Sequence, residues 1–152
     1  MHSQKRSLSL CVVVVMLLVA AGCSRKTDTG GTAGTTGTTG TTAVKVADVT
    51  LGRAISGDKA ISDSTDKFRP NDTIYASVMT DGSAPSATLR AKWTFEDGQT
   101  VDESSRAIAP NNRERTEFHI SKPNGWPAGK YKLEVFLNDQ SAETKTFEVQ
   151  AR

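Results

Sequence analysis

Apolar and polar side chains alternate over most of residues 44–152, and this period of two is the feature that most restricts the fold. The run LRAKWTF at residues 89–95 is an example, with its apolar members on one face and its polar members on the other. No sustained i, i+3, i+4 apolar pattern occurs in the same region. Because side chains alternate across a strand and repeat every 3.6 residues in a helix, we predict an all-β domain.

Seven short segments of this kind are separated by turn residues. In chain order their apolar markers are Val49, Leu51 and Ile55; Ile74, Ala76 and Val78; Leu89, Ala91, Trp93 and Phe95; the return strand 100–108; Phe118 and Ile120; Tyr131, Leu133, Val135 and Leu137; Phe147 and Val149. Asp97-Gly98 predicts a hairpin, because both residues tolerate positive φ, and Asn138-Asp139 predicts a tight turn. Strand 100–108 is expected at a sheet edge. Seven short strands favour a sandwich of two sheets.

The predicted core resembles that of immunoglobulin-like and fibronectin-like domains. Trp93 lies inward on the third strand, where that fold keeps its core tryptophan, and Tyr131 begins the sixth strand, where a tyrosine corner would lie. Ala76 or Val78 and Leu133 stand in place of the paired cysteines of antibody domains. The resemblance therefore excludes kinship with antibodies but implies the same β-sandwich, with about seven strands.

The beginning of the chain has the parts of a secretory signal. Lys5 and Arg6 precede an apolar run at residues 8–21, which ends in small residues before Cys23. The run is shorter than the ~20 residues that a transmembrane helix needs. We therefore interpret residues 1–22 as a signal peptide and not as a membrane anchor.

The last four residues of this region, Ala20-Ala21-Gly22-Cys23, resemble the lipobox of bacterial lipoproteins. Ala20 stands where that family usually has Leu. The resemblance implies cleavage before Cys23 and covalent attachment of lipid to this cysteine, which would anchor the protein to a membrane. The alternative is an ordinary secreted protein with an unused thiol.

Residues 24–43, SRKTDTGGTAGTTGTTGTTA, consist largely of Gly and Thr. The segment has no large apolar side chain, so it cannot bury enough surface to offset the entropy of ordering, and it is predicted to be a disordered linker. Twenty such residues have an r.m.s. span of ~25 Å and a stretched limit of ~70 Å. The alternative is an extended or glycosylated stalk. Three parts result: a signal peptide at 1–22, a lipidated cysteine with its linker at 23–43, and the sandwich at 44–152.

Charge and cysteine content change their meaning once the signal is removed. The chain has 19 Lys+Arg against 17 Asp+Glu, and Lys5 and Arg6 account for the excess. The mature protein is formally neutral, so nucleic acid is not an expected partner. Cys11 leaves with the signal and Cys23 would be acylated, so no disulfide within the mature chain is expected. The fold must then be stable through packing alone.

The residue types that catalysis needs are scarce. The mature chain has one histidine, His119, which lies between two apolar residues and is expected on the solvated face. A zinc site needs three or four ligands, and a serine nucleophile without histidine needs a lysine base; neither set can be assembled by spacing. The carboxylates Asp63, Asp66 and Asp72 are interpreted as turn formers and not as Ca²⁺ ligands. We expect a protein that is not an enzyme and has no cofactor or metal, apart from the lipid on Cys23.

Four residues are candidates for binding a partner: Tyr75, Trp126, Pro127 and Phe136. Phe136 is apolar at a position that alternation assigns to the outer sheet face, which is otherwise expected to hold cross-strand ion pairs such as Lys92 with Glu134. Trp126 precedes Pro127 in a rigid turn, and a rigid aromatic loses little entropy on binding. The alternative is that Trp126 folds back and caps the core. Tyr75 and Trp126 are also the candidate aromatics for glycan binding.

Strand direction predicts which end of the sandwich carries the linker. Antiparallel pairing of the first two strands would place the linker at the end with the Asp81-Gly82 and Asn138-Asp139 loops. The Asp97-Gly98 turn and the loop at residues 121–129 would then lie at the opposite end, away from a membrane.

Three stretches of the domain, FRPNDTIYASVMTDG, AKWTFEDGQTV and FHISKPNGWPAGKYKLEVFLND, resemble a domain that recurs in uncharacterised proteobacterial envelope lipoproteins. The resemblance implies an envelope location and the fold, and no assigned activity. Ser24 after the cysteine resembles outer-membrane sorting in enteric bacteria, so the expected location is the outer membrane, facing the periplasm. We expect a lipid-anchored, non-enzymatic interaction module with an envelope protein partner, an accessory part of an envelope assembly. The alternative is a protein that binds cell-wall or surface glycan.

Overall fold

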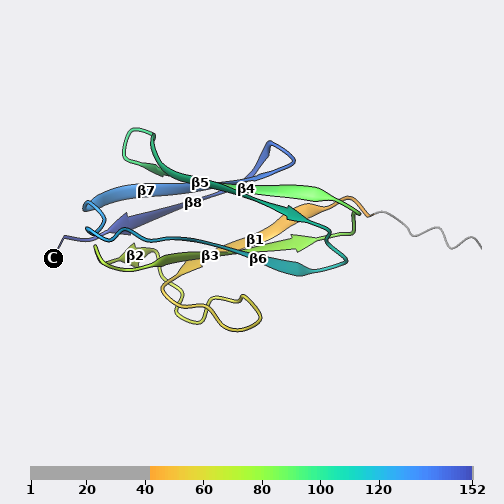
Figure 1. The fold of residues 1–152 in the computed structure, drawn as a ribbon, viewed down its shortest axis with the longest axis horizontal. Helices are drawn as coiled ribbons and strands as arrows, with labels where there is room; N and C mark the ends of the chain where they lie inside the picture. The colour runs from red at the N-terminus through yellow and green to blue at the C-terminus, as the bar shows by residue number, and fades with distance from the viewer. Residues whose placement is uncertain (1–41, 152) are drawn as a thin grey trace, which may run out of the picture. The chain divides into compact units, whose positions relative to one another are not determined.

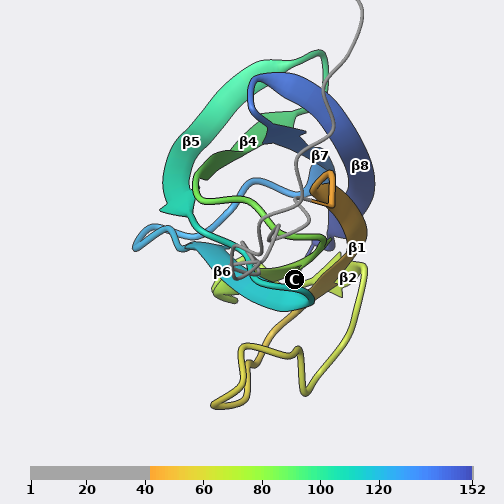
Figure 2. The ribbon, with the colours of Figure 1, turned by 90° about the vertical axis from the view of Figure 1, so that its right-hand side faces the viewer.

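The computed structural model describes residues 42–151, which form two facing β-sheets (Figures 1 and 2). The eight strands are β1 (Lys45–Gly52), β2 (Lys67–Phe68), β3 (Ile74–Asp81), β4 (Ala87–Phe95), β5 (Gln99–Ile108), β6 (Glu114–Ile120), β7 (Gly129–Leu137) and β8 (Gln140–Val149). Within this range no helix is long and apolar enough to cross a membrane. The predicted signal peptide, Cys23 and residues 24–41 lie outside the described residues.

The strand order identifies the architecture. One sheet has the order β1-β3-β6 and the other β2-β8-β7-β4-β5, and every pairing is antiparallel except that of β2 with β8. The chain changes sheet after β1, β2, β3, β5 and β6, which gives the Greek-key connections of immunoglobulin-like sandwiches. The predicted fold class is therefore confirmed. Strand β5 is an edge strand, also as predicted.

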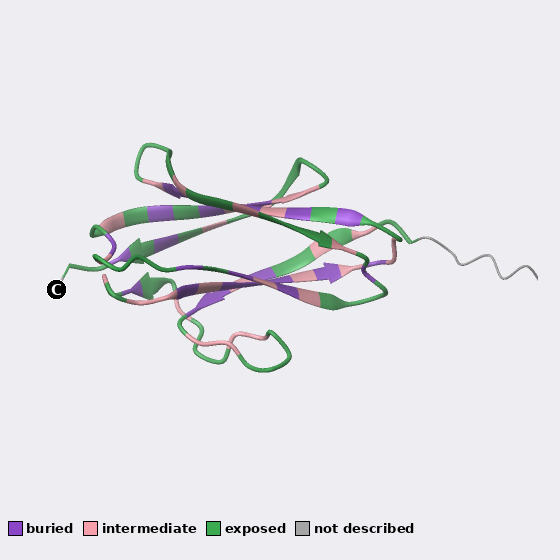
Figure 3. Cartoon of the chain, viewed as in Figure 1, coloured by how far each residue is buried: buried purple, intermediate pink, exposed green. Residues whose placement is uncertain are grey.

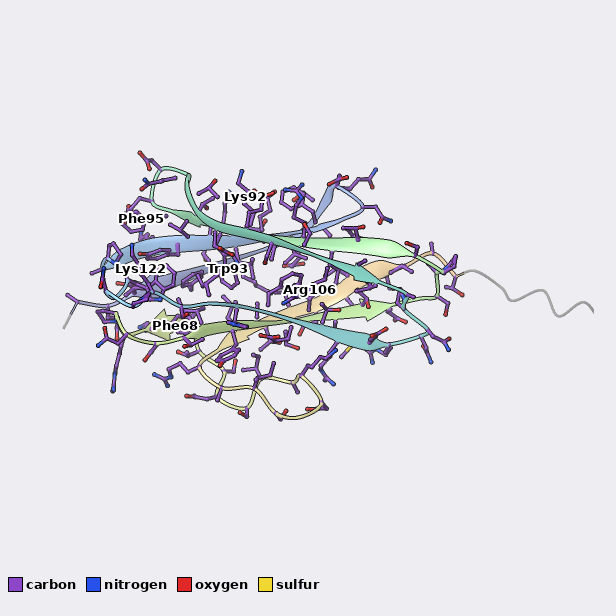
Figure 4. The ribbon with its side chains drawn as sticks, in the orientation of Figure 1. Phe68, Lys92, Trp93, Phe95, Arg106 and Lys122 are labelled. Carbon is purple, nitrogen blue, oxygen red and sulfur yellow. The ribbon has the colours of Figure 1, made fainter. Side chains whose placement is uncertain are left out.

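The core lies between the two sheets, and the predicted inward positions fill it. Buried residues alternate with half-buried or exposed ones along most of β4 and β7, and β3 is buried or half-buried throughout (Figure 3). Trp93 is fully buried (Figure 4), as are Ala76 and Leu133 at the positions that correspond to the antibody cysteines. Phe147 packs edge-on against Trp93, with ring centroids 5.9 Å apart, and stacks on Tyr131 at 5.3 Å. Aromatic packing thus joins β4, β7 and β8.

The structure contains one strand that the sequence analysis missed. Phe68 of β2 is fully buried and contacts Phe147 edge-on at 5.4 Å. The backbone N–H of Glu148 donates to the carbonyl of Asp66 (2.8 Å), and that of Gln150 donates to the carbonyl of Phe68 (2.9 Å). Two residues are too few to show an alternating pattern, so this parallel pairing left no periodic signal.

The first strand ends earlier than predicted, because Ile55 lies beyond it in a folded loop. A Cβ at Gly52 would lie 2.3 Å from the carbonyl oxygen of Asp63, so the strand ends where this loop crosses it closely. Ile55 instead bridges Ile61 within the loop. The loop lies on the outer face of the three-stranded sheet, where Ser77 donates to the carbonyl of Lys59 (2.6 Å).

The turns and the register agree with the sequence predictions except in one detail. Asn138 and Asp139 both have positive φ, as expected of the tight turn between β7 and β8. In the β4–β5 hairpin the residues with positive φ are Glu96 and Gly98, so Asp97 itself does not have the predicted φ. Lys92 is opposite Glu134, as predicted.

The end of the sandwich at which β1 begins is also as predicted. Lys45, at the start of β1, pairs with Asp81. The β4–β5 hairpin lies at the other end of the sandwich (Figure 1).

We predict that Trp93→Ala lowers the free energy of unfolding by ~3–5 kcal/mol, because it removes buried surface and leaves a cavity at the centre of the aromatic packing. Urea denaturation measures the loss. His119→Ala is the control, since this side chain is half exposed and should contribute little. A Trp93 variant that unfolds at the same urea concentration as the parent would refute the assigned core.

Candidate functional site

An open groove crosses the outer face of the five-stranded sheet beside the β4–β5 hairpin. It has a volume of about 720 Å³ and is lined by Asp66, Lys67, Thr94, Glu96, Asp97, Gly98, Lys130, Tyr131, Lys132, Thr146, Phe147 and Glu148. The lining therefore comes from β2, β4, β7, β8 and the hairpin. Of these residues, Thr94 belongs to the polar face of the run at residues 89–95 that the sequence analysis described.

The hairpin forms one wall of the groove, and backbone hydrogen bonds fix it to the start of β7. The N–H of Glu96 donates to the carbonyl of Lys130 (2.8 Å), and the N–H of Lys130 donates to Oε1 of Glu96 (3.0 Å). Gly129 permits this approach, because a Cβ there would lie 2.4 Å from the same Oε1 and 2.7 Å from the Phe95 ring. The wall is thus held in place before any ligand arrives.

The charges of the groove are mixed, and the larger part of its lining is apolar. Three lysines and four carboxylates line it, and its threonine floor includes Thr94, which is only 6% exposed. Such a surface offers both hydrogen-bond donors and acceptors to a polar ligand. Among residues 42–151, no group of three or more His, Cys, Asp or Glu side chains is placed to hold a metal ion.

Tyr131 supports the groove from below. Its hydroxyl donates to the carbonyl of Pro127 (2.8 Å), the tyrosine corner that the resemblance implied. Burial, and to a smaller extent the charge of Glu96, raises the pKa of the Tyr131 phenol. The phenol therefore stays protonated and keeps donating this bond at neutral pH. Pro127, a predicted binding residue, contributes its backbone carbonyl to this hydrogen bond.

Trp126 does not present an exposed aromatic, so its prediction as a binding residue is wrong and the capping alternative is confirmed. The side chain is 6% exposed and packs edge-on against Tyr131, with centroids 6.1 Å apart. Its Nε1 donates to the carbonyl of Asp72 (3.1 Å), in the loop before β3. Asp72 in turn accepts a hydrogen bond from the backbone N–H of Arg69 (2.8 Å), consistent with its predicted role as a turn former.

Phe136 lies on the outer face as predicted, but another side chain covers it. The guanidinium of Arg90, its cross-strand neighbour, lies 3.8 Å from the ring centroid. Arg90 is itself held by Glu103 (2.9 Å) and Asp139 (3.6 Å). A cation over the ring face accounts for an aromatic residue at a polar position without a partner protein.

Tyr75 lies on the other sheet, away from the groove. It is half-buried and opposite His119 on β6, with ring centroids 5.5 Å apart. His119 is on the solvated face, as predicted, and its Nδ1 contacts the carboxylate of Glu117. The structure therefore does not bring Tyr75, Phe136 and Trp126 together into one site.

The groove residues that the sequence analysis missed come from turns and from the unpredicted strand. Lys67 is in β2, and Glu96 and Asp97 lie in the hairpin. Alternation does not extend into turns, so it gave no signal for them. The pairing of Asp97 with Gly98 indicated a hairpin, but it did not indicate the face toward which the hairpin folds.

Comparisons with known proteins give structural similarity only. No protein-family model matches the chain, and no curated protein sequence matches it. An immunoglobulin-like protein from Pseudomonas aeruginosa is 17% identical, with a TM-score of 0.48 over 73% of this chain and 99% of that one. A cycloisomaltooligosaccharide glucanotransferase from Paenibacillus sp. is 16% identical, with a TM-score of 0.49 over 71% of this chain. This chain spans only 14% of the length of the glucanotransferase. Similarity at this level transfers neither an activity nor a ligand.

We predict that Trp126→Ala lowers the melting temperature by several degrees, because it removes both buried surface and the hydrogen bond to Asp72. Trp126→Phe keeps an aromatic side chain but loses the hydrogen bond, so its melting temperature should lie between those of the parent and of Trp126→Ala. Thermal unfolding followed by circular dichroism measures both changes. Lys122→Ala is the control, since its ammonium lies 5.8 Å from the same ring but on the surface. An unchanged melting temperature for Trp126→Ala would contradict the capping role.

Proposed function

We propose that this chain is a lipoprotein of the bacterial envelope that presents its immunoglobulin-like domain as a non-enzymatic binding module. Lipid on Cys23 anchors it to the outer membrane, facing the periplasm, and residues 24–43 act as a tether. The partner is a protein of the envelope, and the module is an accessory part of an envelope assembly. The lipobox-like sequence and the resemblance to envelope lipoproteins support the anchor, and the groove supports binding.

One observation carries the proposal: the groove lies at the end of the sandwich opposite to the start of β1. Residue 45 pairs with residue 81 at one end, and the β4–β5 hairpin that walls the groove is at the other. A domain tethered through its N-terminal end would hold this groove away from the membrane. Its mixed lysines and carboxylates fit a polar segment of a protein partner, since charges arranged in this way set specificity and register.

The glycan-binding alternative has lost one of its two supports. It rested on exposed Trp126 and Tyr75, and Trp126 is in the core. Tyr75 packs beside His119 and lies on the sheet without the groove. The protein-binding proposal is therefore the better supported of the two.

The anchor is tested by replacing the one cysteine expected in the mature chain. We predict that Cys23→Ala moves the protein from the membrane fraction to the soluble fraction, because it removes the site of lipid attachment, and within residues 42–151 no helix is long and apolar enough to cross a membrane. Immunoblotting after cell fractionation and detergent phase separation measures the change. Ser24→Ala is the matched control and should remain with the membrane. A Cys23→Ala variant that stays in the detergent phase would rule out the lipid anchor.

The groove is tested by reversing two of its charges. We predict that Lys67→Glu/Lys130→Glu reduces recovery of a crosslinked partner from native membranes by about fivefold or more, because complementary charges are lost. Lys45→Glu/Lys122→Glu is the matched control, with the same change in net charge at exposed sites outside the groove. Equal recovery with both double variants would contradict a protein site in the groove. Sedimentation of the parent with purified cell wall, unaffected by the groove substitutions, would favour the glycan alternative.

A further inference from the structure

The free edge of β5 is a second open surface of the domain. This strand is ten residues long and pairs only with β4, so its other edge is open. Seven of its residues are exposed and three are half-buried. Figure 2 shows it as the outermost strand of its sheet. A long open edge is a template for pairing with another strand unless charges or bulges block it.

The charges on β5 are arranged symmetrically. Arg106, Ser104 and Asp102 pair with Leu89, Ala91 and Trp93 of β4, which are core residues, so these three polar residues are on the inward face of the sheet. Along the strand, Asp102 is negative, Ser104 is neutral and Arg106 is positive. Neither Asp102 nor Arg106 has an ion-pair partner within residues 42–151. Arg106 instead lies at the open side of the sandwich, with its guanidinium 6.0 Å from the Phe118 ring centroid (Figure 4).

Inward-pointing charges on an edge strand normally prevent pairing. Here they would be compatible with one partner, which is a second copy of β5. If two copies pair antiparallel about a twofold axis at Ser104, Asp102 of each copy is opposite Arg106 of the other. The two unpaired charges of each chain are then both paired.

The backbone N–H and C=O groups at the open edge of β5 belong to the residues that this register needs. The carbonyl of Thr88 accepts from Asn138, and the N–H of Glu96 donates to Lys130, so even-numbered residues of β4 direct their backbone groups to β7. Odd-numbered residues of β4 therefore face β5, and their partners there are even-numbered. Glu103 and Ser105 thus direct their backbone groups to the open edge. About the twofold axis these two residues face each other as hydrogen-bonded pairs, as a ladder requires.

The other free edges do not have this combination. On β6, Arg115 and Glu117 already contact Asp58 and His119. The ladder along β1 has a register shift between Val46 and Asp48, which interrupts a regular edge. In β4–β5 the register shift lies between Trp93 and Thr94, and the extra residue on β5 is Val101, next to the segment 102–106 that would pair.

We propose that β5 is a self-association edge through which two copies of this chain pair antiparallel and form one ten-stranded sheet, with the twofold axis at Ser104. This goes beyond the proposed function and does not depend on it. The axis sends the two linkers to opposite ends of the dimer. Because 20 residues reach ~70 Å when stretched, both Cys23 residues can still enter one membrane if the dimer lies along it.

Cysteine crosslinking tests the register directly. In the non-hydrogen-bonded pair at the axis, the two Ser104 Cα atoms would be about 4.5 Å apart, within the range of a disulfide. Ser104→Cys in the full chain should therefore give a disulfide-linked dimer on a non-reducing gel. Ala107→Cys is the matched control, because its two copies would be about 20 Å apart along the strands. Cys11 and Cys23 are present in both variants, so any crosslink through them appears equally in each.

We predict at least about ten times more dimer with Ser104→Cys than with Ala107→Cys. Equal crosslinking of the two variants, or none in either, would overturn the proposal. A parent chain whose Cys23 proves not to be lipidated would raise the background of both variants equally, and the dimer yield of the parent measures this background so that it can be subtracted from each. The test therefore stands whether or not the lipid anchor is correct.

Charge exchange tests the ion pairs in the same Ser104→Cys background. Asp102→Arg and Arg106→Asp each place like charges opposite each other, and each should lower the dimer yield by roughly fivefold. The double variant restores opposite charges in the same register and should recover the yield to within about twofold. Melting temperatures show that each single variant is folded. The proposed pairing would be refuted if the single variants crosslink as well as Ser104→Cys alone, or if the double variant does not recover the dimer yield.

Discussion

The aromatic packing around Phe147 is the interaction on which the rest of the sandwich depends. Phe147 contacts Trp93, Phe68 and Tyr131, and so joins β8 to β4, β2 and β7. The positions that the resemblance assigns to the antibody cysteines hold Ala76 and Leu133, both fully buried, so apolar packing and not a disulfide stabilises the core there. The cost includes one orphan donor, since Nε1 of Trp93 is buried without a hydrogen-bond partner among the described residues.

The same packing determines the groove. Tyr131 and Phe147 are core residues on one side of their strands and line the groove from beneath, and the hairpin wall is fixed to the residues just before Tyr131. Changes that loosen the core would therefore deform the groove as well. A loss of binding in a groove variant is informative only when stability is unchanged, which is why the matched pairs above substitute exposed lysines.

Much of this fold follows from period-two alternation, because a residue's face depends only on its neighbours. Trp93, Leu133 and the pair Lys92–Glu134 were predictable in this way. For Trp126 the sequence left binding and capping both open, because its hydrogen-bond acceptor is Asp72, 54 residues earlier in the chain. Alternation places Arg90 on the same outer face as Phe136, so a cation above this ring could also have been predicted. The groove depends on a two-residue strand and on the fold of a hairpin, for which local patterns give no information.

The groove and the β5 edge belong to one sheet, and this has a consequence if both proposals hold. The groove residues are in β2, β4, β7, β8 and the hairpin, so a second copy at the β5 edge leaves them open. A twofold axis perpendicular to the sheet keeps both grooves on the same face of the dimer, near opposite ends. An extended or repetitive partner would then meet two sites on one rigid surface. The second contact would form at a high effective concentration, so weak binding at each groove would suffice for stable attachment.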